Sequence, residues 1–235
     1  MGINYFSFAG KMSTDFGVWI SGEATYQSPE KDVDTVVIPG RNGSLSIDNG
    51  RFQNINIPYN AYIIDDFERN FDALKAYLTS FTGYQRLADT YHPDYYRLAR
   101  FYSAVDPEMT QLNRHGKFVL NFDCDPRRFL KSGEIPYTAS SSDVMFNPTQ
   151  FASAPLLRVY GTGTLTISGV SITITAADSY TDIDCELQEA YKGDVNCNAN
   201  IILVDGEFPI MPAGDNEITM SGISRVEITP RWWTI

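Results

Sequence analysis

Apolar and polar residues alternate with a period of two through most of this 235-residue chain. In KFVLNFDC (117–124) every second residue is apolar, as expected of a half-buried strand. TGTLTISGVSITIT (162–175) repeats the pattern on both sides of Ser168-Gly169, which predicts a β-hairpin. The sequence therefore predicts a mainly β fold.

One stretch has helical spacing instead. In DDFERNFDALKAYLTSF (65–81) the apolar residues fall three or four positions apart, on one predicted face. Asp65 and Glu68 predict a capping box at its start, and Gly83 lies just past its end. The amphipathic face predicts packing against a sheet. Its members are Phe67, Phe71, Leu74, Leu78 and Phe81.

A short loop, PGRNG (39–43), raises the question of a ligand site, since two glycines and an arginine could cradle an anion. Phosphate loops carry further glycines or a lysine and lead into a helix, whereas this loop leads into the alternating segment SLSID. Asn42-Gly43 between apolar runs is typical of a hairpin. We therefore interpret the loop as a turn between two strands.

The chain is expected to form two domains. Residues 131–153 are polar and aperiodic, which predicts a domain 1–131, a linker 132–153 and a domain 154–235. The last of these has strands at the spacing of a β-sandwich. Residues 1–131 carry 14 basic and 16 acidic residues, and residues 132–235 carry 4 and 13.

The net charge of −11 argues against nucleic-acid binding, which requires clusters of basic residues. We also expect no membrane span and no secretion signal, because no apolar run is long enough and the first residues lack a basic region followed by an apolar one. Cys124, Cys185 and Cys197 match no zinc or redox spacing. They are expected to be reduced, with a Cys185–Cys197 bridge as the alternative.

No catalytic motif is present. His92 and His115 are the two histidines, and neither lies in a metal-binding or triad pattern, so we expect no catalytic residues, no metal and no cofactor. Asp182, Asp184 and Glu186 share one predicted strand face. They could bind calcium or form a glycosidase pair, but the favoured interpretation is a solvated strand face.

The terminal pair Trp232-Trp233 offers an aromatic ring that could stack on a sugar. Neighbouring strand residues point to opposite faces, so at most one ring lies on each side. Core and interface packing is the favoured role of this pair.

Taken in order, several segments resemble the distal tail protein (Dit) family of long-tailed, non-contractile bacteriophages. They are an F-x-F-x-G start (6–10), the PGRNG hairpin, the amphipathic helix, YYRLARF (95–101) and FVLNFDCDPRRF (118–129). The similarity continues through APLLRVYGTGTLTISG, DIDCELQEAY and PAGDNEITMSG (212–222), and so covers nearly the whole chain.

This resemblance implies an N-terminal belt domain that forms a hexameric ring and a C-terminal galectin-like β-sandwich. The family's ring joins the tail tube protein to the tail-associated lysin, tail fibre or receptor-binding proteins, and DNA passes through it. The implied location is the virion tail tip, after assembly in the host cytoplasm. The hairpin residues Pro39, Gly40, Arg41 and Gly43 become candidates for a subunit interface.

Two alternatives remain from the sequence. One is a glycan-binding β-sandwich module on a phage or cell surface, and the other is a small carboxylate-dependent glycosidase. Galectins bind sugar through an H-x-N-x-R segment, and residues 132–235 contain no histidine. A closed ring of subunits would distinguish the hub from both alternatives.

Overall fold

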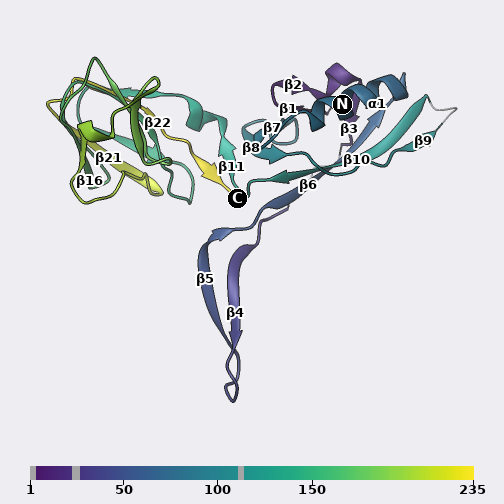
Figure 1. The fold of residues 1–235 in the computed structure, drawn as a ribbon, viewed down its shortest axis with the longest axis horizontal. Coiled ribbons are helices and arrows are strands. Elements are labelled where there is room, and N and C mark those ends of the chain that lie inside the picture. Colours follow the sequence, from purple (N-terminus) through teal and green to yellow (C-terminus); the bar gives the residue numbers. More distant parts are fainter. Residues whose placement is uncertain (1–3, 23–26, 111–113) are drawn as a thin grey trace. The chain divides into compact units, whose positions relative to one another are not determined.

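The computed structural model describes residues 4–22, 27–110 and 114–235. The chain divides into two compact units, one formed by residues up to Arg128 together with Ile235, and the other by Phe129–Thr234. Each unit has its own hydrophobic core. Strands dominate both units (Figure 1), which confirms the mainly β fold class.

The first unit is built around one antiparallel sheet in which the strands follow the order β2-β1-β7-β8-β10-β6-β3, with β9 paired to β10. The longest pairing joins β6 and β10 over nine residue pairs, from Gly116 opposite Ile63 to Cys124 opposite Ile55. The strands are β1 (Phe6–Phe8), β2 (Lys11–Met12), β3 (Val18–Ile20), β6 (Ile55–Ile63), β7 (Gln85–Asp89), β8 (Tyr95–Arg100), β9 (Glu108–Thr110) and β10 (His115–Cys124). A 3₁₀ turn, η1 (Ser13–Phe16), joins β2 to β3.

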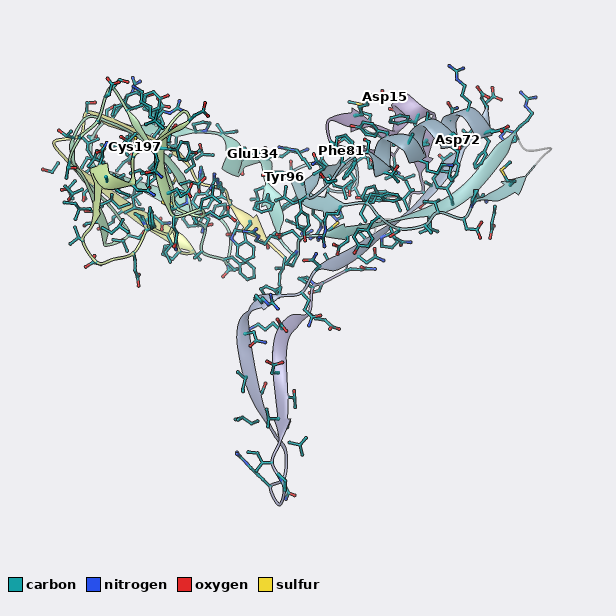
Figure 2. The ribbon with its side chains drawn as sticks, in the orientation of Figure 1. Asp15, Asp72, Phe81, Tyr96, Glu134 and Cys197 are labelled. Carbon is teal, nitrogen blue, oxygen red and sulfur yellow. The ribbon has the colours of Figure 1, made fainter. Side chains whose placement is uncertain are left out.

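The helix α1 (Phe67–Thr79) buries its apolar face in the core of this sheet, as predicted. Phe71 packs edge-on against Phe118 of β10, with ring centroids 5.2 Å apart. The contact with β10 is close, because a methyl group at Gly116 would lie 2.2 Å from the Phe67 ring. Phe81, labelled in Figure 2, lies beyond the helix end and packs edge-on against Phe8.

The predicted capping box is wrong. The helix begins at Phe67, its N-cap residue Asp66 has a left-handed backbone with φ 52°, and no side chain caps the helix. The Asp65 carboxylate instead accepts a hydrogen bond from the Arg114 guanidinium at 3.1 Å. Packing of the apolar face, rather than a cap, fixes where this helix starts.

β4 (Lys31–Val37) and β5 (Ser44–Phe52) form a separate two-stranded sheet that pairs with no other described strand (Figure 1). This confirms that PGRNG is a turn between two strands. The turn is wider than an Asn-Gly hairpin, because Val37 pairs with Ser44 and leaves residues 38–43 as the loop. Gly40 and Gly43 both have positive φ, near 80°, which glycine adopts without strain.

The second unit is a sandwich of two antiparallel sheets. One sheet follows the order β12-β22-β14-β17-β18-β19 and the other follows β13-β21-β15-β16-β20. Their strands are β12 (Tyr137–Ala139), β13 (Asp143–Asn147), β14 (Leu156–Tyr160), β15 (Gly163–Ile167), β16 (Val170–Ile174), β17 (Thr181–Asp184), β18 (Glu189–Lys192), β19 (Val195–Asn196), β20 (Ile201–Leu203), β21 (Gly214–Ser221) and β22 (Arg225–Thr229). Two further strands, β11 (Arg128–Leu130) and β23 (Trp233–Thr234), pair with each other.

The hairpin predicted at Ser168-Gly169 joins β15 and β16. Both residues have positive φ, 50° and 87°, which is the backbone of the two-residue turn that the sequence pattern predicts. Leu165 and Ile167 are fully buried, and the outward threonines hydrogen-bond across to β16. The period-two pattern therefore separates the two faces correctly here.

The stretch 132–153, predicted as a linker, differs from that prediction in the structure. It contains the turn η2 (Lys131–Glu134) and two strands, β12 paired with β22 and β13 paired with β21. Both strands are short, and β12 is flanked by polar turns, so neither produced a clear periodic signal in the sequence. Each strand instead completes one edge of the sandwich.

Candidate functional site

The β4–β5 hairpin carries the residues that the sequence singled out as interface candidates. Pro39, Gly40, Arg41 and Gly43 all lie in its exposed loop. The loop is closed by a hydrogen bond from the Arg41 backbone N–H to the Ile38 carbonyl oxygen, at 3.2 Å. Within the described residues the Arg41 guanidinium has no ion-pair partner, so this charge is available to another molecule.

One face of the hairpin carries three aliphatic side chains beside Asp34 and is the more apolar of the two. The strand register places Val36 opposite Leu45 and Asp34 opposite Ile47, so these side chains share a face. Val36, Leu45 and Ile47 are 46%, 44% and 47% exposed. The other face mixes polar and apolar side chains: Thr35 pairs with Ser46, while Val33 lies opposite Asp48 and Val37, 76% exposed, lies opposite Ser44.

A two-stranded ribbon of this kind is marginally stable in water on its own. Ion pairs hold its base, where Arg51 bonds Asp32 at 2.6 Å and Lys31 bonds Asp48 at 3.2 Å. Val36, Leu45 and Ile47 on the more apolar face are left about half exposed to solvent. We therefore treat this face, Val36, Leu45 and Ile47, as the candidate site, and call it the hairpin face.

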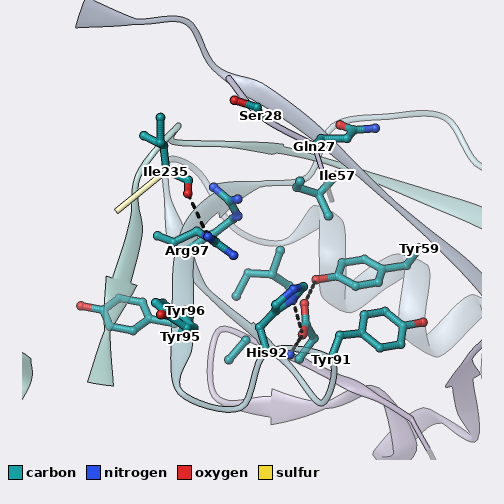
Figure 3. A pocket seen from close by; sticks show the side chains of 14 residues that line it. Gln27, Ser28, Ile57, Tyr59, Tyr91, His92, Tyr95, Tyr96, Arg97 and Ile235 are labelled. Atoms are coloured by element: carbon teal, nitrogen blue, oxygen red, sulfur yellow. Dashed lines mark hydrogen bonds and ion pairs between the residues drawn. The ribbon is translucent and has the colours of Figure 1, made fainter. Parts of the chain in front are cut away.

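A cavity of about 170 Å³ in the first unit contains His92, one of the two histidines weighed as catalytic candidates (Figure 3). The Asp89 carboxylate accepts hydrogen bonds from the Tyr59 hydroxyl at 2.6 Å and from the His92 backbone N–H at 2.9 Å. Burial, and then Asp89, raise the pKa of Tyr59 well above its usual value. His115 begins β10 and does not line this cavity.

Two arginines line the same cavity. Arg97 donates to the Pro126 carbonyl oxygen at 3.1 Å, and Arg128 donates to the Ile235 carbonyl oxygen at 2.8 Å. Burial lowers the pKa of Arg97. The cavity is smaller than the roughly 300–1,000 Å³ of most small-molecule sites. These bonds tie separate loops of the unit together.

The acidic strand predicted to be solvated is not. Asp182 is 5% exposed and Asp184 is 2% exposed, so the solvated-face interpretation is wrong for both. Each carboxylate is held by two hydrogen bonds from one guanidinium, Asp182 by Arg158 and Asp184 by Arg231. Because β17 is a central strand of its sheet, these acids are buried beneath long side chains from elsewhere in the unit.

The carboxylates of Asp182 and Asp184 are the groups that would bind calcium or act in a glycosidase, and both are already bound by arginines. Burial opposes ionisation of Asp184, but the bonds from Arg231 and from the Leu187 and Glu186 N–H groups lower its pKa overall. Asp182 raises the pKa of Arg158 above its usual value. In the described ranges no three His, Cys, Asp or Glu side chains gather as metal ligands.

Trp232 and Trp233 lie in different environments, as strand alternation predicts. Trp232 is buried in the sandwich core, whereas Trp233 stacks on Phe151 with ring centroids 4.4 Å apart. The indole N–H of Trp233 donates to the Ala152 carbonyl oxygen at 2.9 Å. Phe151 thus covers one face of the ring that a sugar would need.

The cysteines are all unpaired, so the alternative Cys185–Cys197 bridge is not formed. Burial raises the pKa of Cys124 and of Cys185 to about 12, which keeps both thiols protonated and unreactive near neutral pH. No helix in the described ranges is long and apolar enough to span a membrane.

Comparison with known proteins shows a similarity of fold but no match from the sequence. No protein-family profile matches the chain, and no curated protein matches it. Among solved structures, the crystal structure of the SPP1 Dit protein, described as a paradigm of the hub adsorption apparatus in phages that infect Gram-positive bacteria, matches with a TM-score of 0.79 and 11% identity over 100% of both chains.

Two structures of the phage p2 baseplate in its activated conformation also match, each over 97% of both chains. The strontium-bound one has a TM-score of 0.55 and the calcium-bound one 0.53, both at 10% identity. The resemblance stated from the sequence is therefore confirmed at the level of structure: this chain has a Dit-like fold, shared with phage hub and baseplate proteins.

Proposed function

We propose that this chain is the structural hub of a bacteriophage tail tip, and that six copies form a ring. The observation that carries the proposal is the match to the SPP1 Dit protein along the whole of both chains, at a TM-score of 0.79. Both units of the chain take part in that match. The role is architectural, and we assign no catalytic residue.

In this proposal the ring joins the tail tube protein to the tail-associated lysin and to the receptor-binding proteins, and DNA passes through its opening. The first unit forms the ring and the second forms the galectin-like sandwich. Residues 1–131, which include the ring-forming unit, carry 14 basic and 16 acidic residues, so this part of the chain has no excess of positive charge with which the lumen could retain DNA.

The hairpin face is the proposed contact between neighbouring subunits. Its three aliphatic side chains are each about half exposed, so burying the rest of one contributes about half of the roughly 1.5–3 kcal/mol of a fully buried side chain. Arg41, at the tip of the same hairpin, would pair with a carboxylate of the adjacent copy, because arginine is favoured at interfaces and binds carboxylates through two hydrogen bonds.

The test is the mass of the full chain in solution, measured by light scattering over a series of concentrations. A hub predicts a species six times the mass of the 26.4 kDa chain, with a central opening in negative-stain images. A protein that stays monomeric at every concentration, or that forms only dimers, would contradict the ring. A glycan-binding module requires neither a sixfold mass nor a central opening.

A further inference from the structure

The charges of the second unit are divided between its two sheets. The four Lys and Arg residues of 132–235 are Arg158, Lys192, Arg225 and Arg231. The first three lie in strands of the six-stranded sheet, and Arg231 pairs with Asp184 of that sheet. The five-stranded sheet contains no basic residue in any of its strands.

The strand β13 forms one edge of that five-stranded sheet, and its outward side chains are apolar. Val144 is 53% exposed and Phe146 is 64% exposed. Their cross-strand partners on β21 are acidic, since Val144 lies opposite Glu217 and Phe146 lies opposite Asp215. We call Val144, Phe146, Asp215 and Glu217 the edge patch.

Edge strands are usually protected by lysines, prolines or a covering loop, because their unpaired backbone groups accept further strands. β13 has no lysine or proline within its five residues, and it presents an exposed aromatic ring instead. It is also short, so one partner segment would be enough to cover it. A strand added here would complete the pairing and bury Val144 and Phe146.

We propose that the edge patch binds an extended segment of another protein, one in which basic and apolar residues share a face, added as a strand along β13. The added strand would lie about 4.8 Å from β13 and roughly twice that distance from β21. An apolar side chain of the partner would pack on Phe146, and an arginine or lysine would reach Asp215 or Glu217. The charge makes a second copy of this chain an unfavourable occupant, because it would bring the same carboxylates to the contact.

A synthetic peptide, RTVTRTVTR, presents arginine and valine on one face of a strand and is the probe for this site. We expect the full-length protein to bind the labelled peptide in a fluorescence anisotropy titration, and to bind it more weakly as salt is added. Replacing both Val144→Thr and Phe146→Ser should weaken binding about tenfold, through lost apolar contact. Asp215→Asn with Glu217→Gln should remove most of the salt dependence.

The matched control is the opposite edge of the same sheet face, where Ile202 and Val204 of the β20 segment are 54% and 60% exposed. Ile202→Thr with Val204→Ser should leave binding unchanged. Equal weakening by both pairs of substitutions would overturn the proposal. So would equal binding of ETVTETVTE, or of the basic peptide carrying N-methyl groups on alternate backbone amides, which cannot pair as a strand.

The mass of the assembled protein tests the remaining alternative, in which a second copy of this chain occupies the edge patch. If the Val144→Thr and Phe146→Ser substitutions lower the mass of the assembled protein, the edge patch is a contact between copies and the proposal is wrong. We expect that mass to be unchanged.

Discussion

The pair formed by Arg231 and Asp184 shows how a single contact can hold a carboxylate in the core of a sheet. Asp184 has a side chain that is 3% exposed, and Arg231 covers it with two hydrogen bonds of 2.8 and 2.7 Å. Removing the guanidinium would leave a buried charge without its partner, which is a large cost in proteins. Arg231 itself is 27% exposed, so water would recover part of that cost.

We predict that Arg231→Met lowers the free energy of unfolding by about 2–3 kcal/mol, since hydrogen bonds to charged groups contribute roughly 1.5–3 kcal/mol and Arg231 is too exposed for the roughly 3–5 kcal/mol of a fully buried pair. Urea-induced unfolding followed by tryptophan fluorescence measures it. The control is Arg225→Met on the same sheet: Arg225 is 48% exposed and 3.6 Å from Glu227. That exposed pair should contribute less than about 1 kcal/mol. Equal effects of the two substitutions would contradict the buried-pair interpretation.

The same variant has a pH signature with a definite sign. In the native protein the folded-state pKa of Asp184 is lowered from 3.8, so its contribution is present above that pH and is lost as the pH falls through the folded value. Without Arg231, burial still opposes ionisation and only the Leu187 and Glu186 N–H groups favour it, so the folded-state pKa should be higher than in the native protein. The difference in unfolding free energy between the two proteins should therefore be largest near neutral pH and shrink below about pH 4. A difference that grows on acidification would refute this assignment.

The burial of Asp182 and Asp184 also shows what the local sequence could not predict. The alternation in DIDCEL correctly predicted a strand at 182–184 and the burial of Ile183, but the strand ends at Asp184 and the acids were expected in water. Their partners lie 24 residues away, at Arg158, and 47 residues away, at Arg231. A pattern of period two reports which residues share a face, and it does not report which long side chains from other strands will cover that face.

At the scale of elements, the hairpin β4–β5 was predictable because its information is local. Alternating strands flank a loop rich in glycine, and the structure pairs those strands. The helix was equally predictable from its apolar spacing, except for its start, where the expected cap is absent. β12 was missed because it has only three residues, and β13 because its consecutive apolar residues Val144, Met145 and Phe146 show no alternation.

We predict that Leu45→Thr with Ile47→Thr on the hairpin face lowers the mass of the assembled protein while leaving its thermal unfolding midpoint almost unchanged. Both side chains are nearly half exposed in a single copy, so they contribute little to its own core and much to a contact that buries them. Light scattering and a thermal melt measure the two quantities. Thr35→Ala with Ser46→Ala, on the opposite face of the same hairpin, is the control and should change neither.

If the hairpin-face substitutions destabilise the single copy as much as they reduce assembly, the face belongs to the subunit's own packing. In that case the proposed interface lies elsewhere. Arg41→Ala separates the two parts of the hairpin proposal, because it removes the tip charge without altering the apolar face. We expect it to weaken assembly more at low ionic strength than at high.

At the scale of the whole molecule, the two units differ in charge as well as in fold. Residues 1–131 are nearly neutral and residues 132–235 are strongly acidic. A ring brings copies of its interface-forming unit together, and self-repulsion makes the acidic unit the less suitable one for that contact. The structural division lies between Arg128 and Phe129, so cutting the chain there separates the two units and breaks the short strand β11.

We predict that a fragment of residues 1–128 retains assembly and that a fragment of residues 129–235 is a soluble monomer. The second fragment keeps β12 and β13, which pair with β22 and β21 and complete one edge of each sheet. A shorter fragment starting at Ser141 loses β12 and leaves the β22 edge unpaired, so it should unfold at a lower urea concentration than 129–235. Size-exclusion chromatography with light scattering reports assembly, and urea titration compares the two C-terminal fragments. An oligomeric 129–235 beside a monomeric 1–128 would reverse the proposed roles, and equal stability of the two C-terminal fragments would show that β12 adds nothing to the sandwich.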